Sequence, residues 1–492
     1  MAHSITSKNT TVLKRKPLPI LLFCLLFCAQ LGAQGIIPRL DTVMLGMNTS
    51  KSIIRNFEQD FVAYLETDAG KFIALLRDET TLLTYPISND FEIRDMDIYG
   101  AYLYYCGVDR SVDRAIVGWI RIYDLYGGTL VHHCYWNNFE DGYGIVVKEL
   151  NKLKVVWQES LVAGGDYVII TAIGSATNNE SSESSSCVLS ALIREGNTSC
   201  TWPYRVEYGR GIGQDNEGSD MNNSFPDEIF TDIAITENYV VVASVPDDSW
   251  MNINLRVRKR NAVLSPLCDT NMIITPNYNF QPSSEFPLDK FLICTIDGDI
   301  LAVVSKKGLG PDQDDGYLLN LIKIDDVYQH LLYPATLSPF HPSLTFYINS
   351  PLPSNTTKLS SLCFSNGLLY LNILSNMTPP NCSFLCEIDP FGGNVNIHYE
   401  ADYWFHSICS SPWGSTSIGI KAYDTTSLRL LHLAPFAGIS CMSQPTDVMQ
   451  YGLDYVGSEQ PDFLNRFTRT SNYILQFIET YATTYNLDNL CY

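Results

Sequence analysis

Short runs of apolar and aromatic residues, separated by turn signals, are the dominant pattern of this chain. The stretch from Asp95 to Gly107 shows it most clearly. An apolar run ends near Ile98, Gly100 follows, and a second run rich in Tyr and Leu begins two residues later. Because Gly readily adopts the positive φ that a tight turn requires, this stretch predicts a β-hairpin.

Four further segments share this spacing, in which an apolar residue is followed six positions later by a β-rich run. With Ile98 as the first anchor, the others are Leu161, Ile233, Cys294 and Cys363, and neighbouring anchors are 61 to 72 residues apart. Each gap contains Gly or Asn where a hairpin needs positive φ. These residues are Gly100, Gly164, Gly165, Asn238, Gly298 and Gly367.

The repeat predicts the architecture. Two more strands, 117–123 and 129–135, follow the first hairpin, so one period holds about four short strands. A period of this length with four strands is typical of a propeller blade with long loops, since compact blades take roughly 40 to 50 residues. We therefore expect an all-β fold, a β-propeller of six or seven four-stranded blades, occupying residues 34–492 as a single domain.

The ends of the repeat are less regular. Residues 61–76 read as a hairpin that fits the template poorly, and strands at 417–423 and 428–433 extend the ring toward the C-terminus. The closing blade is expected to take a strand from each terminus. Residues 36–56 show little pattern, and 472–480 fit either a last strand or a short helix.

The N-terminus has the features of an export signal. Basic residues at positions 8, 14, 15 and 16 precede the apolar run Leu18–Cys28, and small residues follow at 32 and 33. That run is shorter than the roughly 20 apolar residues that span a bilayer. We expect residues 1–33 to be a cleaved secretory signal, and the protein to be periplasmic, cell-surface or extracellular. No later segment has 18 unbroken apolar residues.

Composition and charge narrow the partners. The chain has 46% hydrophobic and 17% charged residues, as globular chains do. Its formal net charge is -21, and removal of the signal takes away only positive charges. Such a surface repels phosphates, which argues against nucleic-acid binding. Of the 14 Cys, the pair Cys187 and Cys200 is the best local disulfide candidate, whereas Cys106, Cys294 and Cys363 also fit as buried apolar fillers.

Motifs that carry chemistry are scarce. The sequence has no HExxH, no phosphate-binding P-loop and no nucleophile elbow. Asp312, Asp314 and Asp315 precede Gly316, and closely spaced carboxylates before a Gly turn can bind calcium. A solvated acidic turn is the alternative, because the third carboxylate falls one position early and no Glu stands at the usual distance. No other cofactor is indicated.

The segment DMDIYGAYLYYCG (95–107), continued by Gly118-Trp-Ile-Arg-Ile122, resembles the opening blade of uncharacterised exported β-propeller-like proteins of Bacteroidetes-type bacteria. The resemblance covers residues 95–122. It implies an exported propeller and brings no catalytic residue.

These observations favour a secreted binding or interaction module, with an acidic, aromatic-rich face suited to a glycan, a peptide or a cation. One alternative is a glycoside hydrolase or lyase that uses two carboxylates at the channel mouth, which the 53 acidic residues do not single out. A third is a structural component of a surface assembly. An extended apolar patch would favour that one.

Overall fold

A computed structural model of the chain describes the strands and part of their connections. The described residues are 41–45, 48–57, 60–77, 81–111, 114–122, 129–135, 137–138, 145–159, 166–178, 184–194, 204–208, 228–246, 253–263, 269–275, 292–307, 316–324, 345–349, 357–375, 383–390, 395–400, 403–411, 414–421, 427–433, 443–445, 448–451, 454–457, 466–468, 472–477, 483–486 and 488–489.

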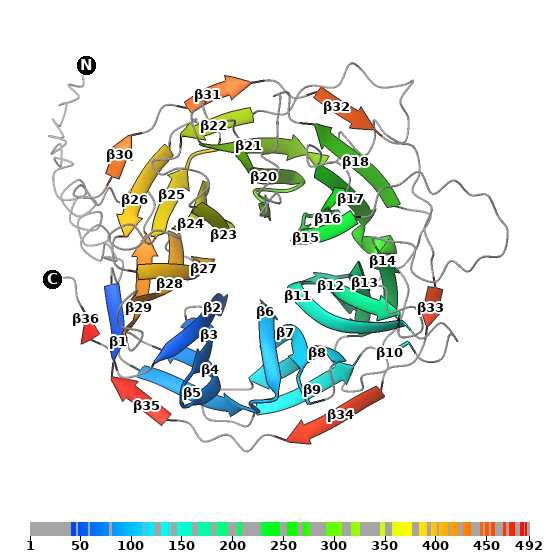
Figure 1. The fold of residues 1–492 in the computed structure, drawn as a ribbon, viewed down its shortest axis with the longest axis vertical. Coiled ribbons are helices and arrows are strands. Elements are labelled where there is room, and N and C mark those ends of the chain that lie inside the picture. The colour runs from blue at the N-terminus through cyan, green and yellow to red at the C-terminus, as the bar shows by residue number, and fades with distance from the viewer. Residues whose placement is uncertain are drawn as a thin grey trace, which may run out of the picture.

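These residues form seven antiparallel sheets arranged radially around a central opening (Figure 1). We name each sheet after the strand that lines the opening. The first three sheets comprise β2 (Thr49–Phe57), β3 (Asp60–Thr67), β4 (Gly70–Arg77), β5 (Thr81–Ile87) and β35 (Thr483–Asn486); β6 (Phe91–Tyr99), β7 (Tyr102–Asp109), β8 (Arg114–Ile122), β9 (Thr129–Tyr135) and β34 (Asn472–Phe477); and β10 (Asn137–Asn138), β11 (Ile145–Gln158), β12 (Tyr167–Asn178), β13 (Ser184–Arg194), β14 (Tyr204–Tyr208) and β33 (Arg466–Thr468).

The other four sheets follow in chain order around the ring. They comprise β15 (Glu228–Ile235), β16 (Tyr239–Pro246), β17 (Ile253–Lys259), β18 (Asp269–Thr275) and β32 (Asp454–Gly457); β19 (Leu292–Thr295), β20 (Ile300–Lys307), β21 (Gly316–Lys323), β22 (Thr345–Asn349) and β31 (Val448–Tyr451); β23 (Thr357–Ser365), β24 (Leu368–Ser375), β25 (Ser383–Ile388), β26 (Val395–Glu400) and β30 (Ser443–Pro445); and β27 (Tyr403–Ser411), β28 (Gly414–Lys421), β29 (Ser427–Leu433), β1 (Asp41–Leu45) and β36 (Asp488–Asn489). Among the described residues, one 3-10 turn, η1 (Arg260–Ala262), directly follows β17.

This arrangement is that of a β-propeller, and it confirms the all-β, propeller-like prediction. The predicted hairpins at Ile98, Ile233, Cys294 and Cys363 are the pairs β6–β7, β15–β16, β19–β20 and β23–β24. In each pair the first strand contributes residues to the lining of the central opening. Gly100, Gly298 and Gly367 have positive φ in the turns of three of them, as the turn chemistry required.

The last sheet closes the ring with both ends of the chain, as predicted. The N-terminal strand β1 pairs with β29, so that Val43 lies opposite Arg429. On its other side β1 pairs with β36 from the C-terminus. Hydrogen bonds between the chain ends therefore hold the ring closed.

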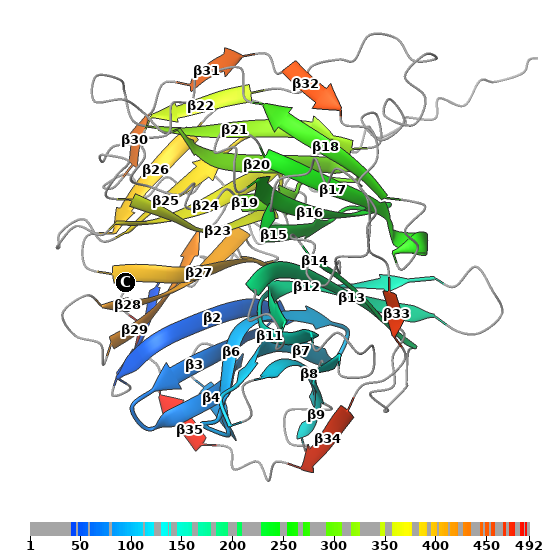
Figure 2. The same cartoon turned by 45° about the vertical axis from the view of Figure 1, so that its right-hand side comes forward.

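The prediction of four-stranded blades is wrong, because a C-terminal belt adds an outer strand to every sheet. We use "C-terminal belt" for β30 to β36, residues 443–489. Its strands pair in turn with β26, β22, β18, β14, β9, β5 and β1, so the belt runs around the ring in the reverse order of the sheets (Figures 1 and 2). It covers the outer edges that would otherwise expose unpaired backbone groups.

Other local expectations need correction. The segment 36–56 contains β1 and β2, and the hairpin 61–76 is the second and third strand of its sheet, which explains its poor fit to a template built on the innermost hairpin. The segment 472–480 forms a strand, β34, but on the β6 sheet. Leu161 lies outside the described residues, and the strand before it, β11, ends at Gln158.

The core lies between neighbouring sheets. One cluster joins the β2 and β6 sheets through Tyr64, Leu75, Met96 and Tyr105, and another joins the β11 and β15 sheets through residues such as Ile169 and Val242. Clusters of the same kind join four other neighbouring pairs. Among the described residues, no helix has the length and apolar character needed to cross a bilayer.

Candidate functional site

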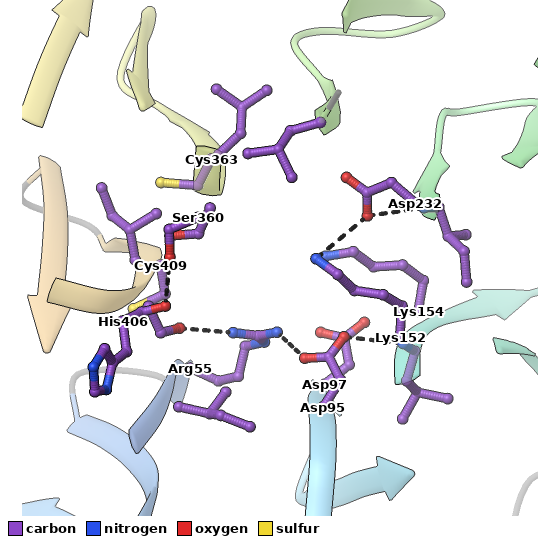
Figure 3. Close-up of a pocket in the computed structure, with 18 of the residues that line it drawn as sticks. Arg55, Asp95, Asp97, Lys152, Lys154, Asp232, Ser360, Cys363, His406 and Cys409 are labelled. Carbon is purple, nitrogen blue, oxygen red and sulfur yellow. Dashed lines mark hydrogen bonds and ion pairs between the residues drawn. The ribbon is translucent and has the colours of Figure 1, made fainter. Parts of the chain in front are cut away.

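The innermost strands of all seven sheets surround a central cavity of about 480 Å³. This volume lies within the range of roughly 300 to 1,000 Å³ typical of small-molecule sites. Its lining residues come from β2, β6, β11, β15, β19, β23 and β27, and most of them are polar or charged (Figure 3).

A repeated backbone irregularity decides which side chains face the cavity. In β6, β11, β15, β23 and β27 a β-bulge interrupts the pairing with the second strand. Successive side chains of a strand point to opposite faces, so the residue after the bulge and the residue two positions later share an orientation. The residues after the bulge are Asp95, Lys152, Asp232, Ser361 and Ser407, and all five line the cavity.

The positions two residues later are Asp97, Lys154, Ala234, Cys363 and Cys409, and all but Ala234 line the cavity. The sequence signal for this repeat is an apolar residue, any residue, a polar residue and another apolar residue. It occurs as IRDM, LNKL, FTDI, LSSL and FHSI, ending at Met96, Leu153, Ile233, Leu362 and Ile408. Spacing measured from the hairpin turns does not reveal this pattern, because the hairpin connections differ in length.

Three residues at the bulge tie one inner strand to the next. Leu153 N–H donates to Asp95 Oδ2 at 2.9 Å, and Ile293 N–H donates to Asp232 Oδ2 at 3.0 Å. Ser407 Oγ accepts the backbone N–H of Ile54 at 3.3 Å. These side chains replace the missing backbone ladder between sheets.

One half of the cavity is lined by acidic and basic side chains. Arg55 Nη2 lies 2.5 Å from Asp95 Oδ1, and Lys152 Nζ lies 3.7 Å from Asp232 Oδ1. Burial alone would lower the pKa of Lys154. The nearby carboxylates, Asp97 foremost, outweigh burial and leave that pKa above its usual value. The ammonium of Lys154 is therefore charged at neutral pH.

The carboxylates of this half are occupied by backbone donors. Asp95 also accepts the N–H of Met96 at 2.9 Å, and Asp97 accepts those of Ile98 at 3.1 Å and Val155 at 2.8 Å. Asp232 accepts its neighbour's N–H at 3.0 Å in addition to that of Ile293. Each carboxylate thus binds two backbone N–H groups, which fixes its orientation.

The opposite half of the cavity carries hydroxyls and thiols, from β23 and β27. Cys363 and Cys409 are free thiols that line the cavity there. Burial raises the pKa of the Cys409 thiol to about 12, and burial likewise raises that of Cys363. Both are protonated at neutral pH, which makes them poor nucleophiles.

A third group lies toward the N-terminal ends of the inner strands. Lys51 Nζ donates to the carbonyl of Ile93 at 2.7 Å. Burial, and then the charge of Arg94, lowers the pKa of Lys51. Burial, together with the charge of Lys51, lowers the pKa of His406 to about 4. His406 is therefore neutral in the folded protein near pH 7.

His406 makes a pH dependence predictable. Between about pH 6.5 and about 4 the unfolded chain takes up a proton at this position and the folded chain does not, so stability falls as pH falls through that window. We expect His406→Gln to lose less stability than wild type between pH 7 and pH 4.5, measured by urea unfolding. The contributions of the other titrating groups cancel when the pH dependence of the variant is subtracted from that of wild type. Equal pH dependence of both proteins would contradict the neutral, buried imidazole.

The sites suggested by sequence fare differently. Asp312, Asp314 and Asp315 lie outside the described residues, so the calcium prediction stays untested. The prediction of a Cys187–Cys200 disulfide is wrong, because Cys187 is a free thiol, buried within β13 opposite Gly174. Cys200 itself lies outside the described residues. Cys134 is disulfide-bonded. Among the described residues, no cluster of three His, Cys, Asp or Glu could hold a metal ion.

The cavity itself differs from the acidic, aromatic face that we expected. No Tyr, Trp or Phe is among its lining residues, and basic groups outnumber acidic ones there. The polar residues in the bulge repeat were not predicted, because their convergence depends on ring closure.

Comparison with known proteins does not assign the chain to a family. No family model and no curated protein matches the chain. Among solved structures, an endosialidase of phage phi92 is similar with a TM-score of 0.32 and 12% identity, over 87% of this chain and 70% of that one. The WD40 domain of SCAP from fission yeast gives a TM-score of 0.28 and 12% identity, over 83% of this chain and 75% of that one. Neither likeness extends to a function for this chain.

Proposed function

We propose that the protein is a seven-bladed β-propeller, exported through the signal at residues 1–33, that acts as a binding module with its ligand in the central cavity. One observation carries the proposal. Inner strands from six of the seven sheets place polar or charged side chains around a cavity of about 480 Å³, a size suited to a small ligand, and the seventh, β19, adds Leu292 and Ile293. A purely structural channel would be expected to fill with apolar side chains, since buried charges are costly.

A hydrolase that uses two carboxylates is not favoured. Asp95, Asp97 and Asp232 converge on the cavity from two different sheets, as such an enzyme requires. Their oxygens, however, already accept backbone N–H groups or face a cation, so they are engaged as acceptors within the protein. A glycosidase needs one carboxyl group that is protonated near neutral pH and donates its proton to the leaving group.

A structural component of a surface assembly is likewise not favoured by the described surface. Ile229 is the single large hydrophobic residue found exposed among the described residues. One such residue does not make the extended apolar patch that an assembly interface needs.

The test is to introduce bulky side chains at residues that line the cavity and to measure ligand binding. Asn151 and Ser410 line the cavity and are exposed; Asn151 lies midway along β11 and Ser410 near the C-terminal end of β27. We expect Asn151→Trp or Ser410→Trp to fold normally and to abolish the thermal stabilisation that a ligand from a small-molecule library gives the wild type. Asp90→Asn, an exposed site outside the cavity, should behave like wild type. Ligands that stabilise wild type and both Trp variants equally would place binding elsewhere.

A further inference from the structure

The charge of the cavity is opposite to that of the whole protein. Five basic residues line it, against three acidic ones: Lys51, Arg55, Arg94, Lys152 and Lys154, against Asp95, Asp97 and Asp232. His406, the remaining titratable base among the lining residues, is neutral near pH 7. The chain as a whole carries a formal charge of -21. Charges on cavity walls act more strongly than exposed ones, because less water screens them.

Hydrogen-bonding capacity in the cavity is skewed in the same direction. The three carboxylates together accept six backbone N–H groups, so their capacity for a ligand's donors is small. The two lysines Lys152 and Lys154, in contrast, keep hydrogen-bond donors for a ligand. Lys152 Nζ is 3.7 Å from Asp232, beyond hydrogen-bond distance, and Lys154 interacts with carboxylates through charge alone among the described residues.

The guanidinium of Arg55 adds to this surplus. Its Nη atoms bind Asp95 and the carbonyl of Ile54, and its Nε is buried, so Arg55 acts on a ligand through its positive charge. A ligand that supplies oxygen acceptors and negative charge would satisfy groups that the protein leaves unsatisfied. A cation supplies neither, and a neutral sugar supplies acceptors without the negative charge.

We infer that the central cavity binds a small polyanion bearing phosphate or carboxylate groups, with Lys152 and Lys154 as its main contacts. This inference rests on the proposed binding function and names its ligand class. A ligand can reach Lys152 directly, because 36% of the Lys152 side chain is exposed. The carboxylates beside the lysines help to hold the ammonium groups in position, and the volume of about 480 Å³ limits the site to a small ligand.

The experiment uses the purified full chain and two probes, inorganic pyrophosphate and citrate, with glucose as a neutral control, in isothermal titration calorimetry at low salt. We expect either anion to bind, glucose not to, and the affinity to fall as ionic strength rises. Lys154→Met should weaken binding at least tenfold. Lys358→Met is the matched control, because Lys358 is exposed on β23 and does not line the cavity, and it should bind as wild type does.

Each outcome bears on the inference. If Lys154→Met fails to fold, Lys152→Met, at a more exposed position, gives the same comparison. Absence of binding by both anions, or equal binding by the cavity and control variants, overturns the inference. Neutral ligands that bind wild type but not Asn151→Trp, without anion binding, would overturn the ligand class and leave the binding module standing. Anion binding that the Trp variants do not affect would overturn both.

Discussion

Asp95→Ala is expected to destabilise the protein by about 4 kcal/mol, measured as the free energy of unfolding in urea. Asp95 is 6% exposed and joins the β6 sheet to two others, through Arg55 and through Leu153 N–H. Its removal leaves the Arg55 guanidinium without its carboxylate partner, and leaves two backbone N–H groups without that acceptor. Breaking one side of a buried ion pair costs about 3 to 5 kcal/mol, more than the pair itself contributes.

Two control variants distinguish the cost of leaving the Arg55 charge unpaired from the cost of removing any carboxylate. Asp90→Ala removes an exposed carboxylate before the same strand and should change stability by less than about 0.5 kcal/mol. The double variant Arg55→Met/Asp95→Leu removes both charges and should recover part of the loss, because no ion remains unpaired. A double variant less stable than Asp95→Ala would show that the ion pair is not the cause.

Gly107→Ala is expected to destabilise the protein by about 3 kcal/mol or more, with a lower melting temperature by differential scanning calorimetry. Gly107 lies opposite Ile93, at the bulge of β6. A Cβ at this position would stand 1.9 Å from the carbonyl oxygen of Glu92 and 2.9 Å from its carbon. Both are backbone atoms, so no rotamer change relieves the clash and the bulge itself must shift.

The contrast with another glycine of the same hairpin makes this prediction sharp. Gly100 has a φ of +57°, and a Cβ there would meet nothing within 4 Å. Gly100→Asn, which tolerates the left-handed region, should therefore cost less than about 1 kcal/mol. Gly174 faces the bulge of β11 as Gly107 faces that of β6, with a Cβ 1.8 Å from the Glu149 oxygen, and Gly174→Ala should behave like Gly107→Ala. Normal stability of both Ala variants would contradict the close approach.

Local pattern was enough to predict the innermost hairpins, because both strands and their turn lie within about 20 residues of each other. The turn glycines and the apolar runs of β6–β7, β15–β16, β19–β20 and β23–β24 carry that information without help from the rest of the chain. The use of both termini in the last sheet also followed, since a ring of repeats must close.

The C-terminal belt could not be predicted, because its pairing partners are distant and its strands are short. The strand β34 has six residues and pairs with β9, and β36 has two. Strands of this length have little pattern of their own, so their positions depend on edges that exist only after the sheets have formed.

The sequence by itself determined the repeat of β-hairpins, the glycines that their turns and bulges require, and the acidic charge of the chain. The tertiary structure alone decided that the bulge residues of different sheets meet in one cavity, and that this cavity is basic. The reason is physical. Which face a side chain takes is a local property of its strand, whereas the field in the cavity is the sum over inner strands that only ring closure brings together.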